Sequence, residues 1–573
     1  MRQIIKKSMA FFICLILIIL AASCNNNRNV DNGDKDNGKD SDNKGTVEIP
    51  DYLNMDSQLP IVKPGTVDVT LKIMVRCGPY YQDMKSLDEI YFVKKYEERT
   101  NVKVEWQRVD NNAFDDALTA SLAAGELPDV IMKGNVSNSI QRQYGEQGFF
   151  VNLMENDMLK TFAPNYYALT QKYPDILPSS LMPDGSLYSL GLVRNSVGSV
   201  INSKLYFNKE WLAAVGKSVP KTANELYEVL KAFKNNDPNK NGKQDEIGLY
   251  TSSSHLQMAT LGMFGLSNRG STNTHIDMNP STGKARYFPI TDDYRKWVEY
   301  VSRLYREGLL NKEYYEFTES KLGVYVGSNV CGAFAYTNLS ALDSKNQEKI
   351  TYLESPLTGP DGKNDWAGTT SVGNTGSYII TTACKYPEVA LRWADYLYSD
   401  EGALFYYYGD VGVTAVKKDD GTYEFSDSVL KDFYAGKNSY DGCAVYVSLY
   451  AYGNSPTKTQ VPFNSADDNR GVSLKSAYAL INGRTIAWPA FTFTKQEERA
   501  ISDIKKDIDQ YVNTTRDAWI MGTMQLNDAT WNKFVNRIKQ MGVDKVVDAY
   551  NAALQRAYEQ GFKEGTYTSD SFK

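Results

Sequence analysis

The chain has 573 residues, which is more than the roughly 250–300 residues that one hydrophobic core usually supports, so its length predicts several domains. Its formal net charge of −6 argues against a nucleic-acid partner, because such proteins carry basic stripes. A hydrophobic content of 42% is enough for a real core, and the 40 tyrosines supply rings with both an apolar face and a hydroxyl, which suits wet binding clefts as well as cores.

The start of the chain has the pattern of a secretory signal peptide. Basic residues precede an apolar run over 9–20, and this run is shorter than the roughly 20 residues that a membrane-spanning helix needs. Small residues then lead to Cys24, a pattern that resembles the lipobox of bacterial lipoproteins, although Ala21 stands where that family usually has leucine. We expect 1–23 to be a lipoprotein signal peptide and Cys24 to be acylated, for example by palmitate. An ordinary signal peptide with an incidental cysteine is the alternative.

A polar segment follows the cysteine. Residues 25–45 are almost entirely Asn, Asp, Lys and Gly, with Val30 as the one apolar residue. Such a segment cannot bury enough surface to offset its ordering entropy. We expect a disordered tether over 24–65.

The body of the chain begins with strands and helices in alternation. Alternating apolar residues predict strands, and apolar residues at a spacing of three and four predict helices. The expected strands are 67–75, 102–106 and 129–132, and the expected helices are 90–96 and 114–122. This order is typical of a parallel sheet with helices on its faces.

Further along the chain, helices can be placed from their end signals. Thr222 and Glu225 have the spacing of a capping box, so a helix is expected to begin after Thr222. Pro387 suits the first turn of another helix. Two late helices, around 501–511 and 531–538, are expected to be structural cladding.

Several short motifs carry a resemblance to a known family. In chain order they are 122–131 (LAAGELPDVI), 185–190 (GSLYSL), 205–212 (LYFNKEWL), 219–226 (VPKTANEL), 383–391 (ACKYPEVAL) and 398–402 (YSDEG). Their order and spacing resemble the extracellular solute-binding proteins of ABC importers, in particular family 1 members of the oligosaccharide-binding type. The resemblance runs from about residue 67 to the C-terminus.

The resemblance implies a fold and a division of the chain. The fold is a two-lobed α/β fold of the type II periplasmic-binding-protein class, with a hinge and a ligand cleft between the lobes. We assigned the segments as follows: first lobe 66–192, second lobe 193–330, first lobe again 331–375, and second lobe with C-terminal helices 376–573.

One loop has the pattern of a calcium site. Oxygen-bearing side chains recur at the spacing of an EF-hand loop, with Gly242 at its sixth position. The resemblance to oligosaccharide-binding relatives implies the same shortened loop and a structural Ca²⁺. The expected ligands are Asp237, Asn239, Asn241, the carbonyl of Lys243, Asp245 and Glu246. A solvated polar turn without an ion is the alternative.

No motif favours an enzyme. The two histidines, His255 and His275, leave little for a catalytic triad or a transition-metal site. The chain has no P-loop and no nucleophile-elbow motif. Because a glycosidase needs only two carboxylates, sequence alone does not exclude one. Cysteines 77, 331, 384 and 443 lie far apart, so they are expected to be buried residues and not a disulfide framework.

We expect ligand contacts just beyond the predicted strands, where polar groups and aromatic faces can meet a sugar ring. The candidates are Arg76, Tyr80, Tyr81, Asn135, Arg194, Tyr336 and Trp366. Each has an ordinary alternative: the arginines can be surface ion pairs, and the aromatic residues can belong to the core.

The sequence therefore predicts a lipid-anchored, monomeric binding protein on the outer face of the cell membrane. It would capture an oligosaccharide and deliver it to the transmembrane permease subunits of an ABC transporter, without chemistry of its own. A receptor for a peptide or another organic solute on the same fold, and a surface carbohydrate-active enzyme, are the alternatives.

Overall fold

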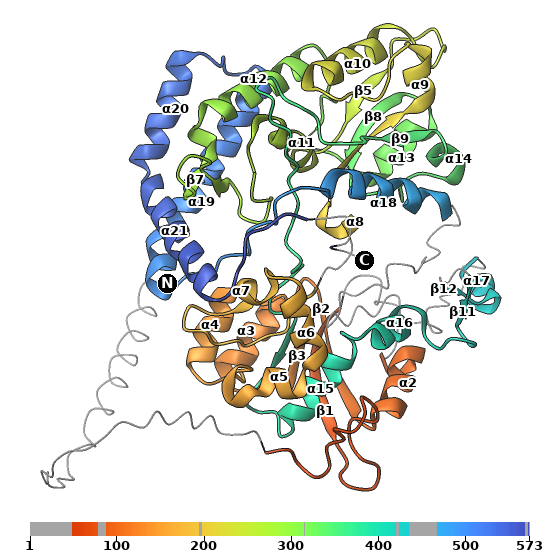
Figure 1. The fold of residues 1–573 in the computed structure, drawn as a ribbon, viewed down its shortest axis with the longest axis vertical. Coiled ribbons are helices and arrows are strands. Elements are labelled where there is room, and N and C mark those ends of the chain that lie inside the picture. Colours follow the sequence, from red (N-terminus) through yellow and green to blue (C-terminus); the bar gives the residue numbers. More distant parts are fainter. Residues whose placement is uncertain are drawn as a thin grey trace, which may run out of the picture. The chain divides into compact units, whose positions relative to one another are not determined.

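The computed structural model describes residues 48–77, 87–193, 197–314, 316–419, 423–434, 467–567 and 571. The described chain forms two α/β lobes, each built around its own four-stranded sheet (Figure 1). None of the helices in these ranges combines the length and the apolar character needed to cross a membrane.

The first sheet is mostly parallel and has the strand order β10-β3-β1-β2. Its strands are β1 Thr70–Cys77, β2 Lys103–Asp110, β3 Val130–Met132 and β10 Tyr378–Ile380. Strand β1 runs parallel to both β2 and β3, whereas β10 is antiparallel to β3. These pairings confirm the prediction of three parallel strands. Leu71, Ile73 and Val75 are at most 1% exposed, as the apolar alternation predicted.

Helices cover this sheet. They are α2 Tyr91–Thr100, α3 Phe114–Ala124, α4 Asn138–Glu146, α5 Met158–Phe162, α6 Pro164–Lys172, α7 Ile176–Ser180, α15 Pro387–Tyr396 and α16 Asp400–Tyr408. Figure 1 shows α15 and α16 beside β1 and α2, although more than 270 residues separate them in the chain. Aromatic packing joins them: the rings of Phe92 and Phe405 are 5.1 Å apart, and those of Tyr96 and Trp393 are 5.0 Å apart.

The second sheet has the order β5-β8-β4-β9. Its strands are β4 Lys204–Asn208, β5 Ile247–Tyr250, β8 Cys331–Tyr336 and β9 Ile350–Tyr352. Helices of this lobe are α8 Val197–Val200, α9 Lys209–Ala214, α10 Ala223–Asn235, α11 Ser253–Thr260, α12 Asp292–Arg306, α13 Glu319–Gly327 and α14 Ser344–Gln347. Two short hairpins complete the described strands: β6 Ile276–Met278 with β7 Ala285–Tyr287, and β11 Ala415–Lys417 with β12 Tyr423–Phe425.

The later helices are α17 Asp427–Tyr434, α18 Asp467–Ile481, α19 Lys495–Met521, α20 Asp528–Gln540 and α21 Val543–Glu559. The longest of them, α19, begins with a reciprocal capping box between Thr494 and Glu497. It packs along α12 of the second lobe and buries Ile508 and Trp519. The prediction of late helices as structural cladding agrees with this packing.

Two boundaries of the expected division need correction. Strand β8 pairs with β4 and β5, so 331–336 belongs to the second sheet and not to the first lobe, where 331–375 had been placed. Conversely, β10 pairs with β3, and α15 packs against β10, α5 and α6. The chain that directly follows residue 375 therefore belongs to the first lobe and not to the second. The helices from α18 onward then pack against the second lobe.

The expected tether also ends earlier than residue 65. Ile61 and Val62 are fully buried, and Leu53 pairs with Val62 in an antiparallel bridge. Tyr52 donates a hydrogen bond to a carboxylate oxygen of Glu388, in α15. Residues 50–63 are thus part of the folded first lobe, because their apolar side chains cover its core.

Candidate ligand-binding site

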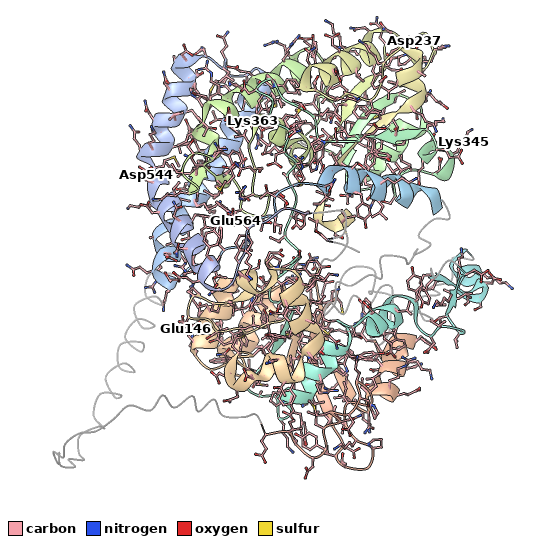
Figure 2. All side chains as sticks on the ribbon, in the orientation of Figure 1. Glu146, Asp237, Lys345, Lys363, Asp544 and Glu564 are labelled. Carbon is pink, nitrogen blue, oxygen red and sulfur yellow. The ribbon has the colours of Figure 1, made fainter. Side chains whose placement is uncertain are left out.

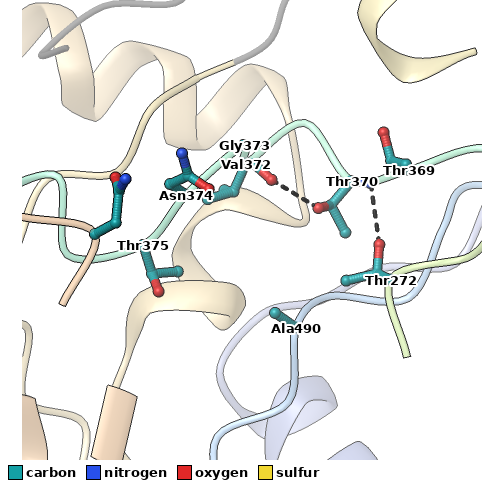
Figure 3. A pocket seen from close by; sticks show the side chains of 9 residues that line it. Thr272, Thr369, Thr370, Val372, Gly373, Asn374, Thr375 and Ala490 are labelled. Carbon is teal, nitrogen blue, oxygen red and sulfur yellow. Dashed lines mark hydrogen bonds between the residues drawn. The ribbon is translucent and has the colours of Figure 1, made fainter. Parts of the chain in front are cut away.

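A pocket lies where the chain crosses from the second lobe back to β10. The segment 369–375 forms one wall, and the cavity has a volume of about 330 Å³. Its lining consists of Asn135, Thr272, Thr369, Thr370, Val372, Gly373, Asn374, Thr375 and Ala490. Figure 3 shows these threonines and Asn374 along the crossing segment, with Thr272 and Ala490 reaching it from other parts of the chain.

The crossing segment is held by its backbone. It runs antiparallel to the earlier crossing, with a bridge between Val193 and Val372, and the Gly373 N–H donates to the Leu192 carbonyl at 2.7 Å. At its start, the Thr369 N–H donates to the Val200 carbonyl at 2.9 Å. Two crossings that share backbone hydrogen bonds form a hinge whose position also sets one wall of the pocket.

Side chains fix the threonines that face the cavity. The Thr370 N–H donates to the Thr272 hydroxyl at 3.3 Å, and the Thr370 hydroxyl donates to the Val372 carbonyl at 2.8 Å (Figure 3). Thr272 thereby connects the second lobe to the crossing. The orientation of the wall is determined by these bonds and not by packing alone.

Asn135 enters the lining from the first lobe. It follows the carboxyl end of β3 and has a positive φ of 49°, a conformation that asparagine adopts more readily than most residues. Arg76 supports this turn, because its guanidinium donates to the Gly134 carbonyl at 2.9 Å and pairs with Asp115 at 2.5 Å. The same guanidinium lies over the ring of Phe114 at 4.4 Å.

The lining has a definite chemical character. Among the described residues it includes no charged side chain, and its polar groups are hydroxyls and amides. Hydroxyls and amides can each donate and accept, so this set matches a neutral ligand that is rich in hydroxyl groups.

The predicted ligand residues have different positions in the structure. Asn135 lines the pocket, and Arg76 supports the turn next to it. Tyr336 is half-buried in an aromatic cluster at the end of β8, with ring separations of 5.2 Å to His255 and 5.3 Å to Phe317. Tyr80, Tyr81, Arg194 and the lipidation residue Cys24 lie outside the described residues.

Trp366 has a structural explanation that does not involve a ligand. It is 4% exposed, belongs to the main hydrophobic core, and donates its indole N–H to the Ser203 carbonyl at 3.1 Å. The pocket lining does not include it. Residues that sequence reasoning missed are Thr272, Ala490 and the crossing segment, whose run GTTSVGNTG over 368–376 offered one signal, a polar glycine-rich stretch before a buried strand.

The calcium-like loop follows α10 at the outer edge of the second lobe, where Figure 2 labels Asp237. The two carboxylate oxygens of Asp237 accept the N–H groups of Asn241 and Gly242, each at 3.0 Å. The Asn241 side chain accepts the Lys243 N–H at 2.7 Å and donates to the Asp245 carboxylate at 3.1 Å. These bonds wrap the loop around its own oxygen-bearing side chains.

The loop also contains an unsatisfied acceptor. One carboxylate oxygen of Glu246 is buried without a hydrogen-bond partner. Burial, and then the charges of Asp245 and Asp237, raise the pKa of Glu246. A divalent cation would relieve this repulsion, so the oxygen donors fit a hard cation such as Ca²⁺. Within the described ranges no three His, Cys, Asp or Glu side chains form a metal-binding group, so an ion here would also need asparagine and main-chain oxygens.

The chain is similar in sequence to proteins whose names specify carbohydrate binding. The chain is 24% identical over 548 residues to the fructooligosaccharide ABC transporter substrate-binding protein FusA of Streptococcus pneumoniae. This alignment covers 90% of this chain and 94% of FusA. It is 24% identical over 493 residues to the polygalacturonan/rhamnogalacturonan-binding protein YtcQ of Bacillus subtilis, covering 82% and 88% of the two chains.

Solved structures share the fold. A FusA EF-hand mutant in complex with fructo-nystose superposes with a TM-score of 0.65 at 21% identity, covering 86% of this chain and 99% of that one. An HMO-binding solute-binding protein from Bifidobacterium longum infantis gives a TM-score of 0.68 at 19% identity, covering 85% and 99%. The two-lobed type II fold expected from the sequence is therefore confirmed.

The family follows from a match over more than half of the chain. Residues 79–404 match the family model described as bacterial extracellular solute-binding protein. The match includes the second sheet, the first-sheet strands β2, β3 and β10, and the crossing segment that walls the pocket, and it begins just after β1. This chain belongs to the bacterial extracellular solute-binding protein family.

Proposed function

We propose that this solute-binding protein captures an oligosaccharide in the pocket at the crossing segment and delivers it to the permease of an ABC transporter. The observation that carries the proposal is the lining of hydroxyl and amide groups without a charged side chain among the described residues. Sugars present many neutral hydroxyls, which such groups bind in either hydrogen-bonding sense. A relative whose name specifies fructooligosaccharide supports the same neutral class, and one whose name specifies polygalacturonan supports a sugar ligand more broadly, because that polymer carries carboxylates.

Capture requires no bond to be made or broken in the ligand. The pocket holds no titratable side chain among its described lining residues that could act as a general acid or base. The permease and its ATPase would supply transport. We therefore propose a binding role and not a carbohydrate-active enzyme, and unchanged oligosaccharide after prolonged incubation with the protein is the expected chromatographic result.

Calorimetric titration tests the proposal. The panel is kestose, nystose, trigalacturonate and a mixed set of short peptides. One oligosaccharide is expected to bind at a stoichiometry of one, and Asn374→Ala is expected to weaken it by about 3- to 10-fold, the loss of one or two hydrogen bonds. Asn224→Ala, at the start of α10, is the matched control: Asn224 lies outside this pocket and lines a second cavity, so loss of affinity in this variant alone would place the sugar there. Binding of peptides alone would contradict the proposal.

We also propose that the loop at 237–246 holds a structural Ca²⁺. The unpaired Glu246 oxygen and the raised pKa of its carboxyl support an ion there, as does the existence of an EF-hand mutant of FusA. The ion would pin the end of α10 to the start of β5. A chelator is expected to lower the melting temperature, and Asp237→Asn is expected to reduce that effect; an unchanged melting temperature in chelator would count against the ion.

Finally, we propose attachment to the outer face of the cell membrane through an acylated Cys24, with the protein as a monomer. The apolar segment and small residues before Cys24 support this proposal. A tether would keep the receptor near its permease at a raised effective concentration. Metabolic labelling with palmitate should mark the wild type and not Cys24→Ala, and labelling of both would contradict acylation at this residue.

A further inference from the structure

A buried carboxylate lies directly behind the pocket wall. Asp175, just before α7 in the first lobe, is 1% exposed. Its carboxylate accepts a hydrogen bond from the backbone N–H of Ser371. Ser371 stands between Thr370 and Val372, which both line the pocket, and is itself fully buried. The carboxylate therefore binds the middle of the wall without being a lining residue itself.

The segment that carries Asp175 is itself rigid. The Asp175 carbonyl accepts both the N–H and the hydroxyl of Ser179, at 3.2 Å and 2.6 Å. The Ser179 hydroxyl in turn accepts the N–H of Ala490, another lining residue, at 3.2 Å. Two walls of the pocket are thus tied to the same turn before and within α7. A change at Asp175 would reach the crossing segment while the rest of this turn stays in place.

Among the described residues, no cationic side chain contributes to the pKa of this carboxylate. The titratable groups whose charge interacts with that of Asp175 among the described residues are two phenols, Tyr173 before α7 and Tyr567 near the C-terminus. Burial raises the pKa of Tyr173 to about 12 and that of Tyr567 still higher, so both stay neutral near pH 7. The same desolvation raises the pKa of Asp175 to about 6, against the opposing effect of the N–H groups of Ser371 and Val372.

We propose that Asp175 is a positioning residue for ligand capture, which in its ionised form holds the Ser371 N–H and thereby the pocket wall over 369–375. The inference rests on the proposed function, since it concerns how the same pocket is kept in its binding shape. A hydrogen bond to an ionised acceptor is roughly twice as strong as one to a neutral acceptor. The Ser371 N–H lowers the pKa of Asp175, so this bond is stronger to the ionised carboxylate than to the neutral one, although burial as such favours the neutral form. Protonation inside the folded protein would therefore weaken this bond and loosen the wall, so ligand affinity should fall in mildly acidic solution.

The first experiment needs no ligand. Hydrogen exchange of the peptide that covers 369–375, corrected for the intrinsic effect of pH, is measured in the purified protein at pH 7.5 and pH 5. Protection of this peptide is expected to fall in the wild type at pH 5. In Asp175→Asn, a nearly isosteric change that keeps an acceptor for Ser371, protection is expected to be low and equal at both pH values. Equal protection of the wild type at both pH values would overturn the proposal.

The second experiment measures affinity for kestose, or for trigalacturonate if kestose does not bind. The wild type is expected to bind about 5-fold more weakly at pH 5 than at pH 7.5, which is the difference between a charged and a neutral acceptor. Asp175→Asn should bind about 5-fold more weakly than wild type at pH 7.5 and show no dependence on pH. A variant that keeps the wild-type pH dependence, or a wild type that binds more tightly in acid, would overturn the proposal.

Asp395→Asn is the matched control. Asp395 is also buried with a raised pKa, of about 7, but its carboxylate accepts the N–H groups of Asn165 and Tyr166 at the start of α6, neither of which lines the pocket. This variant should keep the wild-type dependence of both exchange and affinity on pH. If Asp395→Asn also lost this pH dependence, acid would be loosening the protein generally and not through Asp175, and the role of Asp175 would be overturned. If no sugar binds at any pH, the proposed function fails, and the exchange experiment still decides this inference.

Discussion

Replacing Trp366 with phenylalanine separates a role in the core from a role in ligand binding. The change keeps most of the buried apolar area but removes the indole N–H that donates to the Ser203 carbonyl at 3.1 Å. Ser203 is 0% exposed, so its carbonyl cannot turn to water, and a buried unsatisfied acceptor costs about 1–3 kcal/mol. The smaller ring leaves a cavity that adds about 1 kcal/mol. We therefore expect Trp366→Phe to lower the free energy of unfolding by about 2–4 kcal/mol.

Urea denaturation followed by circular dichroism measures this difference, because the change also removes a fluorophore. Tyr558→Phe is the control: Tyr558 is 37% exposed and loses only a hydroxyl bond to Glu564, so its stability should stay within about 0.5 kcal/mol of wild type. Affinity for the oligosaccharide should be retained in Trp366→Phe. Unchanged stability together with lost affinity would refute the reasoning and would return Trp366 to the ligand contacts predicted from sequence.

Three further changes test the packing and electrostatics of the lobes. Asp277→Ala leaves Arg286 without the fully buried carboxylate that it contacts at 2.6 Å and 3.0 Å, and should cost about 3–5 kcal/mol in urea denaturation; a loss below about 1 kcal/mol would mean that the pair is solvated. Gly262→Ala should cost about 1–3 kcal/mol, because the new methyl group would overlap with the Asp365 carbonyl oxygen; wild-type stability would argue against this close approach. Burial raises the pKa of Asp395 from 3.8 to about 7, so the folded state binds more protons than the unfolded state in this range. Its contribution to stability is present below pH 3.8 and is lost as pH rises to about 7, and Asp395→Asn should remove this component from a series of melts across that range.

Local patterns in the sequence predicted the elements of the fold well. The alternation over 67–75 predicted β1, which the structure places at Thr70–Cys77: Leu71, Ile73 and Val75 pack into one core, and Met74 on the opposite face is buried in another. Pro387 begins α15 as expected. The capping box at Thr222 is confirmed in part. The Thr222 hydroxyl accepts the Glu225 N–H at 3.1 Å, but the Glu225 carboxylate accepts the N–H of Lys221, one residue before the expected partner.

The allocation of segments to lobes could not be predicted in the same way. It depends on which strands pair, and β8 pairs with β4 and β5 from more than 80 residues earlier in the chain. Nothing local distinguishes a strand of one sheet from a strand of the other. The same holds for the site, whose lining combines Asn135, Thr272, the crossing segment and Ala490 from four distant parts of the chain.

Rules based on residue type predicted only some of the residues in the candidate site. The rule that polar groups follow strand ends identified Asn135, which lines the pocket, and Arg76, whose guanidinium supports the turn before it. The rule that an unexplained tryptophan meets a sugar led to Trp366, because sequence does not reveal that Ser203 accepts its N–H inside the core. The threonines of 369–375 are small and common, so their residue type alone did not predict a binding site; the backbone brings them together in the fold.

The most direct test of ligand capture at the crossing segment is a crystal structure of the protein with the tightest-binding oligosaccharide of the panel. We expect the sugar to lie against Asn135, Asn374 and the threonines of 369–375, with hydrogen bonds to their amides and hydroxyls. A sugar bound elsewhere would contradict the account, for example in the cavity of about 440 Å³ lined by Tyr227 and Tyr300 beside α10 and α12.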